Sequence, residues 1–95
     1  MDTHFAIVLE HFDGSASALA AAVGGNVKRQ NVEYWITTGR VPVAHRPAVE
    51  RATEGLVTCE QLSLGDGAQW ARIPDKSWPW NKKGRPTHDI ARVAA

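Results

Sequence analysis

Apolar residues at the start of the chain recur with the period of a helix. Four of them stand at i, i+3, i+4 and i+7, the spacing that gathers side chains on one helical face: Phe5, Val8, Leu9 and Phe12. Asp2 or Thr3 can accept hydrogen bonds from the first free amides of such a helix. The pattern therefore predicts a helix over residues 2–12 that buries one face.

A second helix is predicted after a break at residues 13–14. Ser15 stands where an N-cap is needed, and the residues that follow are rich in alanine, which has the highest helix propensity. Its predicted inward face consists of Leu19, Ala22 and Val23. Residues 24–26, two glycines and an asparagine, tolerate positive φ angles and are expected to end it.

A third helix combines a narrow apolar stripe with a polar outer face. Asn26 can cap it and Gly39 can end it. Three of its residues are expected to be buried: Val32, Trp35 and Ile36. The other side chains are rich in hydrogen-bonding groups: Lys28, Arg29, Gln30, Asn31, Glu33 and Tyr34.

Two shorter helices are predicted before residue 64. The fourth carries its apolar face on Val49 and Ala52, and it should begin near residue 43 or 44. Pro47 then lies in its first turn, where a missing N–H is tolerated. Residues 58–61 have the form of a capping box that begins a short fifth helix.

The composition changes after residue 66. Residues 67–95 contain three of the four tryptophans and three of the five prolines. Alternation and β-branching over residues 69–73 and 87–93 predict two strands of a hairpin. We therefore expect a mainly α fold: a five-helix domain over residues 1–66, followed by a Trp-rich, basic C-terminal β-hairpin or extended arm over residues 67–95.

Charge is divided unevenly along this chain of 95 residues, although its net charge is only +1. Residues 1–26 carry −3, residues 27–51 carry +3, residues 52–71 carry −3 and the remainder carries +4. Basic segments of this kind can form a face that meets phosphate, but a solvated surface of mixed charge explains them equally well.

Other features of the sequence disfavour several classes of protein. The apolar runs are shorter than the roughly 20 residues of a membrane span, and the N-terminus lacks a signal-peptide pattern, so we expect a cytoplasmic protein. Cys59 lies inside the capping box, which favours a small buried residue over a nucleophile. His4 and His11 would lie about 10 Å apart along a helix, too far to share a metal. We expect no enzyme, no metal site and no cofactor.

The second and third predicted helices, joined by a glycine turn, have the pattern of a helix-turn-helix. In that motif the second helix lies in the major groove of DNA, where Arg reads guanine, Gln or Asn reads adenine, and Lys or Arg neutralises phosphate. Side chains with this chemistry follow one another at Lys28, Arg29, Gln30 and Asn31, and Arg40 can reach the DNA backbone. The pattern indicates sequence-specific binding of double-stranded DNA.

A series of short motifs supports this hypothesis: Gly14-Ser15, Leu19-Ala20, Val32, Trp35, Arg40-Val41-Pro42, residues 47–53, Gly55 and residues 57–62. The series resembles the YdaS-like, Cro-related regulators of bacterial prophages and toxin–antitoxin-like loci, over about residues 14–64. The turn at residues 24–26 is two residues longer than the family pattern. The resemblance implies a nucleoid-associated transcriptional regulator that binds a palindromic operator as a homodimer, without a cofactor. The alternative is an antitoxin-type module that neutralises a cognate toxin protein through the C-terminal arm.

Several single residues leave alternatives open. Glu33 can accept from cytosine, or it can pair with Arg29 four residues earlier. Tyr34 can donate to phosphate or pack at the helix edge. Three basic residues of the arm can contact flanking phosphates, although a charged loop tip is the commoner explanation: Lys82, Lys83 and Arg85.

The apolar residues of the arm have no obvious partner within the predicted helical domain. A two-stranded hairpin alone is marginal in water. We therefore expect these side chains to be buried against the core or across a two-fold axis. The predicted dimer interface consists of Trp70, Ile73, Trp78, Trp80 and Ile90.

Overall fold

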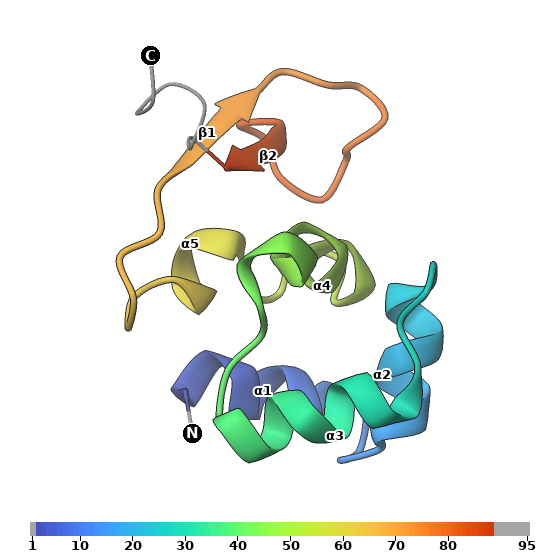
Figure 1. Cartoon of the computed structure of the whole chain (residues 1–95). Helices are drawn as coiled ribbons and strands as arrows, with labels where there is room; N and C mark the ends of the chain where they lie inside the picture. Colours follow the sequence, from blue (N-terminus) through green and yellow to red (C-terminus); the bar gives the residue numbers. More distant parts are fainter. Residues whose placement is uncertain (1, 89–95) are drawn as a thin grey trace.

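Three helices lie together at one end of the molecule (Figure 1). In a computed structural model that describes residues 2–88, α1 spans Thr3–His11, α2 spans Ala16–Val23 and α3 spans Arg29–Thr38. Both predicted N-caps are confirmed: Asp2 Oδ1 accepts from the His4 amide at 2.8 Å, and Ser15 Oγ accepts from the Ala18 amide at 3.0 Å.

The core is formed where the apolar faces of these helices meet. Phe5 and Val8 of α1 are buried, as predicted, and the buried residues of α2 are Leu19, Ala20 and Val23. The prediction that Ala22 lies on the inward face is therefore wrong, because Ala22 is only partly buried. Ala20 is buried in its place. The small side chain of Ala20 allows a close approach of the neighbouring helices.

The third helix begins later than predicted, and Asn26 is not its cap. The Val27 amide donates to the Gly24 carbonyl at 3.2 Å, and Val27 then packs against the core before the helix starts. Lys28 is the N-cap residue, and its amide donates to Asn31 Oδ1 at 2.8 Å. The extra turn length thus places one more apolar residue in the core.

A 3-10 turn, η1 (Val43–His45), leads directly into α4 (Arg46–Ala52), and α5 spans Cys59–Leu62. The helical conformation begins at residue 43, as predicted, but as a 3-10 turn, and the α-helix itself begins only at Arg46. The place of Pro47 in the first turn is confirmed. So is the capping box. Gln61 Oε1 accepts from the Thr58 amide at 2.9 Å, and Thr58 Oγ1 accepts from the Gln61 amide at 3.2 Å.

The chain ends in an antiparallel hairpin of β1 (Trp70–Ile73) and β2 (Arg85–His88). Trp70 pairs with His88 and Ile73 with Arg85. The second strand begins two residues earlier than predicted, and residues 89–93 of that prediction lie outside the described part of the chain. Pro86 of β2 stands opposite Arg72 and has no N–H, so its nitrogen occupies an outer-edge position that the ladder does not need.

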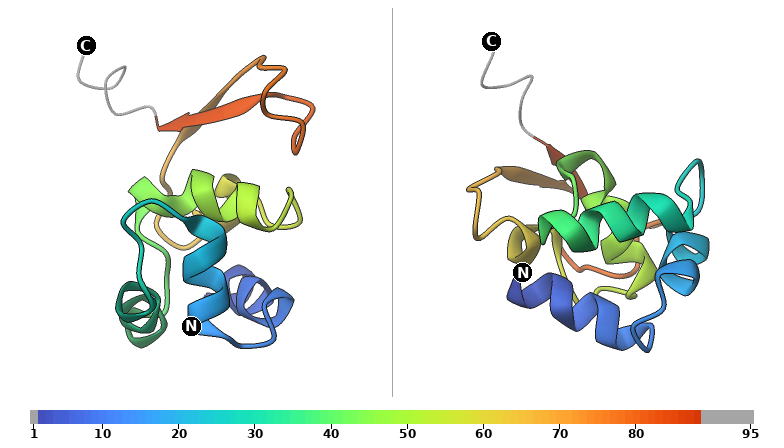
Figure 2. Two further views of the ribbon diagram at one scale, coloured as in Figure 1. Left: turned by 90° about the vertical axis from the view of Figure 1, so that its right-hand side faces the viewer. Right: turned by 60° about the horizontal axis from the view of Figure 1, so that its bottom comes forward.

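The hairpin covers α4 and α5 on the side away from α1 and α3 (Figures 1 and 2). The fold is therefore mainly helical, with five α-helices and one small antiparallel sheet in residues 2–88. No single helix in this range is long and apolar enough to cross a membrane, and α1 and α2, which together have the length and composition, meet at 91°.

Candidate nucleic-acid interface

One stripe of α3 is fully turned toward solvent. At about 100° per residue, the stripe opposite buried Val32 and Trp35 is formed by Gln30, Glu33, Tyr34 and Thr37, and all four are exposed. Thr37 was not among the predicted site residues, although its position seven residues after Gln30 places it on the same face. The stripe presents an amide, a carboxylate and two hydroxyl groups in order along the helix.

Arg29 and Glu33 lie beside each other at the start of this face. Arg29 Nε is 3.4 Å from Glu33 Oε1, and the side chains are 64% and 54% exposed. The pairing that the sequence left open is therefore present. An exposed pair of this kind contributes about 1 kcal/mol or less, so either side chain can exchange it for a contact with a ligand at little cost.

Asn31 lies on the flank of the helix and is already engaged. Its Oδ1 accepts from the Lys28 amide at 2.8 Å, which closes the first turn of α3. Bidentate reading of adenine uses both the oxygen and the nitrogen of an Asn side chain. While this cap is in place, only Asn31 Nδ2 can face a ligand. The Lys28 side chain is exposed beside it.

Trp35 fixes α3 to the hydrophobic core. Only 3% of its surface is exposed, and its ring lies 5.2 Å from the ring of His45 in η1. Val32 is completely buried one turn earlier, while Ile36 is partly buried and packs against the core. The predicted division of α3 into a buried stripe and a polar face is confirmed.

The turn between α2 and α3 is tied to α4 by Arg51. Its Nη2 donates to the carbonyl oxygen of Val23, the last residue of α2, at 2.7 Å. A guanidinium at this place satisfies an otherwise free carbonyl at the negative end of the helix. No local pattern indicated this role of Arg51, because its partner lies 28 residues away.

Tyr34 and Arg40 come together at the other end of α3. With Thr38 and Pro42 they line a hollow of about 190 Å³. Tyr34 is 66% exposed, so it does not pack as an ordinary helix-edge aromatic. Arg40, which was predicted to reach the DNA backbone, and Tyr34, for which phosphate contact was one of two alternatives, thus share one surface.

Two tryptophans of the arm bond to the helical domain of the same chain, which is the first of the two expected places of burial. Trp70 Nε1 donates to Ser63 Oγ at 2.7 Å, and Trp78 Nε1 donates to Glu50 Oε2 at 2.9 Å. Trp80 packs edge-on against Trp78, with ring centroids 4.8 Å apart. Ile73 remains 43% exposed, and Ile90 lies outside the described residues.

Glu50 is the centre of the contact between arm and domain. It is completely buried and accepts hydrogen bonds from Arg72, Trp78 and the Cys59 amide. Burial alone would raise the pKa of Glu50, but the hydrogen bonds from Arg72, Cys59 and Trp78 outweigh burial and hold that pKa below its usual value. Cys59 itself is buried, as predicted, and burial raises the pKa of its thiol.

A second buried cation lies beneath α5. Arg46 Nε donates to the Val41 carbonyl at 2.9 Å, and its Nη1 donates to Ser63 Oγ at 2.9 Å and to Asp66 Oδ1 at 3.1 Å. This network joins the start of α4 to the segment before η1, to the C-cap of α5 and to the loop that precedes β1. No pattern in the sequence predicted these roles of Arg46, Glu50 and Arg72.

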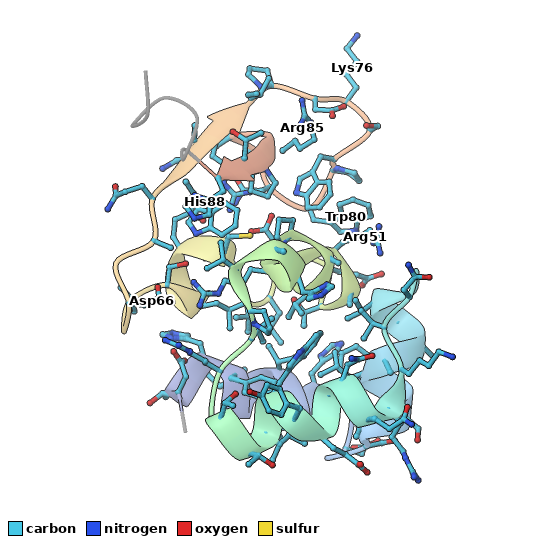
Figure 3. The ribbon with its side chains drawn as sticks, in the orientation of Figure 1. Arg51, Asp66, Lys76, Trp80, Arg85 and His88 are labelled. Carbon is cyan, nitrogen blue, oxygen red and sulfur yellow. The ribbon has the colours of Figure 1, made fainter. Side chains whose placement is uncertain are left out.

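The basic residues of the hairpin loop are remote from α3. Figure 3 places Lys76 at the far tip of the hairpin, pointing away from the helices. Arg85 pairs with Asp75 at 3.2 Å, and Lys82 and Lys83 are exposed. Across residues 2–88, no group of three or more His, Cys, Asp or Glu side chains is arranged to hold a metal ion.

Comparison with known proteins gives one result. The family model described as "Bacterial toxin YdaS" matches residues 6–66, from within α1 to the loop after α5. No curated protein and no solved structure matches the chain. The matched range contains the exposed face of α3, the hollow at its end and the buried Arg46 and Glu50. Since it covers more than half of the sequence, the chain belongs to the bacterial toxin YdaS family.

Proposed function

We propose that the protein is a sequence-specific, double-stranded-DNA-binding transcriptional regulator of a prophage or toxin–antitoxin-like operon. The observation that supports this most is the division of α3. Its outer stripe consists of exposed hydrogen-bonding side chains, while the opposite stripe is fixed in the core by Val32 and Trp35. A rigid helix with such a face is what the major groove accepts.

The dimensions of α3 suit that groove. With its side chains an α-helix is about 10–12 Å in diameter, and the groove is about 12 Å wide. Gln30 and Arg29 lie in its first turn, where the recognition helices of such motifs contact bases. The exposed Lys28 precedes them and is suited to phosphate.

A dimer that reads a palindrome is part of the proposal. Such dimers hold their recognition helices about 34 Å apart. The longest extent of the described chain is 36 Å, which is of the same order as this spacing. The hairpin lies away from α3 and leaves its outer face uncovered (Figure 2). In sedimentation, Ile73→Asp is expected to yield monomers. Leu64→Asp, at an exposed site outside the hairpin, should leave the dimer intact.

The test begins with a footprint on the DNA upstream of the gene. On the sequence found, Arg29→Ala is expected to cost about 1–3 kcal/mol and to relax one base position, whereas Lys28→Ala should weaken binding to all sequences and lower the salt slope by about one unit. Unchanged preference in Arg29→Ala would exclude Arg29 as a base reader. No salt-sensitive binding to any DNA would overturn the proposal itself.

A second function is supported by the position of the hairpin. Its loop lies over α4, where Trp78 donates to Glu50, and it exposes Pro79, Lys82 and Lys83. Such a surface suits an antitoxin-type module that captures a protein. Stoichiometric binding of the adjacent gene's product, abolished by Lys82→Glu with Lys83→Glu, would favour this function. Promoter binding without such capture would favour the regulator.

A further inference from the structure

The hollow at the C-terminal end of α3 has the chemistry of an anion site. Its lining consists of Tyr34, Thr38, Arg40 and Pro42, and none of these carries a negative charge. Two other hollows on the described surface differ in this respect. One contains Asp2 and Asp66, and the other contains Glu10.

The charge of Arg40 is available to a ligand. Among residues 2–88, no carboxylate lies within 4 Å of its guanidinium. Asp66 is on the neighbouring side, but Asp66 is already bound by two nitrogens of Arg46. The exposed Arg40 side chain, which together with Thr38 also lines the neighbouring hollow that contains Asp2 and Asp66, therefore forms no ion pair within the described residues.

The backbone brings Arg40 back toward Tyr34. Gly39 has φ +81°, a left-handed conformation that reverses the chain at the helix end. The amides of Gly39 and Arg40 donate to the Trp35 carbonyl at 2.8 and 3.1 Å, which covers one of the helix-end carbonyls that would repel an anion. Thr38 Oγ1 donates to the same carbonyl at 3.1 Å. Tyr34 and Arg40 remain as the donors that can turn to a ligand.

We propose that this hollow seats a phosphodiester group of the DNA backbone, held by the Arg40 guanidinium and the Tyr34 hydroxyl. The inference rests on the proposed function and adds a defined subsite to it. Its volume of about 190 Å³ is several times the roughly 30 Å³ share of one water molecule, which leaves room for a phosphate group. Lys28 lies at the opposite end of α3, about 15 Å away along the axis, so the two cations can meet the two strands that border the groove.

The experiment replaces single phosphates of the footprinted operator by neutral methylphosphonates. The unaltered protein is expected to lose about tenfold or more in affinity at one position in each half-site. Arg40→Ala should bind the substituted and normal DNA equally, with a salt slope lower by about one unit and an unchanged sequence preference. Tyr34→Phe should reduce the same sensitivity in part. Lys76→Ala, at the far tip of the hairpin, is the matched control and should keep the full sensitivity.

The outcomes separate this inference from the proposed function. If the protein binds the operator but Arg40→Ala remains fully sensitive to methylphosphonate at every position, the proposed phosphate site is wrong. The proposed function in DNA binding is then unaffected. If the protein binds no DNA, a titration with inorganic phosphate followed by amide chemical shifts decides the chemistry of the hollow. Shifts at Tyr34 and Arg40 would then assign the hollow to a free anion, and their absence would exclude an anion site altogether. Either result would overturn the DNA-backbone assignment.

Discussion

The guanidinium of Arg72 on β1 forms a bidentate pair with the carboxylate of Glu50 on α4, with Nη1–Oε2 and Nη2–Oε1 distances of 2.8 and 2.6 Å. The Glu50 side chain is completely buried and that of Arg72 is 8% exposed. Removing one partner of a buried ion pair leaves the other charge without compensation. The hairpin is therefore held to the helical domain by an interaction that is costly to break.

Glu50→Gln is expected to lower the free energy of unfolding by about 3–5 kcal/mol, because Arg72 then remains buried without its main counter-charge. Glu60→Gln is the matched control. Glu60 also binds Arg72, but its side chain is 49% exposed, so its loss should cost about 1 kcal/mol or less. Urea unfolding measures both. Equal losses in the two variants would contradict the dominant role of Glu50.

Acid should destabilise the protein. Burial would raise the pKa of Glu50, but its hydrogen bonds hold it below the usual value, and the hydrogen bonds from Arg46 lower the pKa of Asp66. The unfolded chain therefore binds these protons more readily than the folded protein. The stability they supply is complete above the ordinary carboxyl range near pH 4, and it is lost as the pH falls through the lowered values. Urea unfolding from about pH 7 to about pH 3 tests the sign, and a rise in stability on acidification would contradict it.

Trp35→Ala is expected to cost about 3–5 kcal/mol of stability, because it leaves a large cavity under α3. Tyr34→Ala, one residue earlier but 66% exposed, should change stability by about 0.5 kcal/mol or less. Thermal unfolding of both variants makes the comparison. If Trp35→Ala kept its thermal midpoint and lost only DNA binding, Trp35 would belong to the interface instead of the core.

Two glycines with positive φ should respond differently to alanine. At Gly25 (φ +61°) a Cβ atom meets nothing within 4 Å. Gly25→Ala should therefore lower the free energy of unfolding only by the cost of the left-handed conformation, about 1–2 kcal/mol. At Gly55 (φ +81°) a Cβ atom would overlap the carbonyl oxygen of Trp80. Gly55→Ala should therefore lose clearly more stability and change the near-ultraviolet dichroism of the tryptophans. The same cost at both sites would show that the hairpin loop moves aside freely.

The helices were predictable because their signals are local. Apolar spacing, the Asp2 and Ser15 caps and the capping box at residues 58–61 act within a few residues, and the structure contains all of them. The start of α3 was not predictable in this way. It depends on Val27 packing against the core, which is a tertiary contact that outweighs the capping preference of Asn26.

The buried charges could not be read from the sequence for a related reason. Arg46 and Glu50 stand four residues apart, the spacing of an ordinary exposed helical ion pair. In the structure they turn to different partners, Asp66 and Arg72, which lie 20 and 22 residues further along the chain. The sequence does not show whether a charged side chain is buried. Only the folded structure distinguishes such residues from the charged residues of a solvated surface. The polar face of α3, in contrast, required only the helical period.

Pro86 limits how copies of this protein can associate. A two-stranded sheet with two open edges can add strands on both sides, and identical copies can then continue into an endless ribbon. Pro86 offers no donor at the outer edge of β2, so strand addition is confined to the side of β1. Once that side is occupied by a second copy, both remaining outer edges carry a proline. A single imino acid thus limits any edge-to-edge pairing of the hairpins to two subunits.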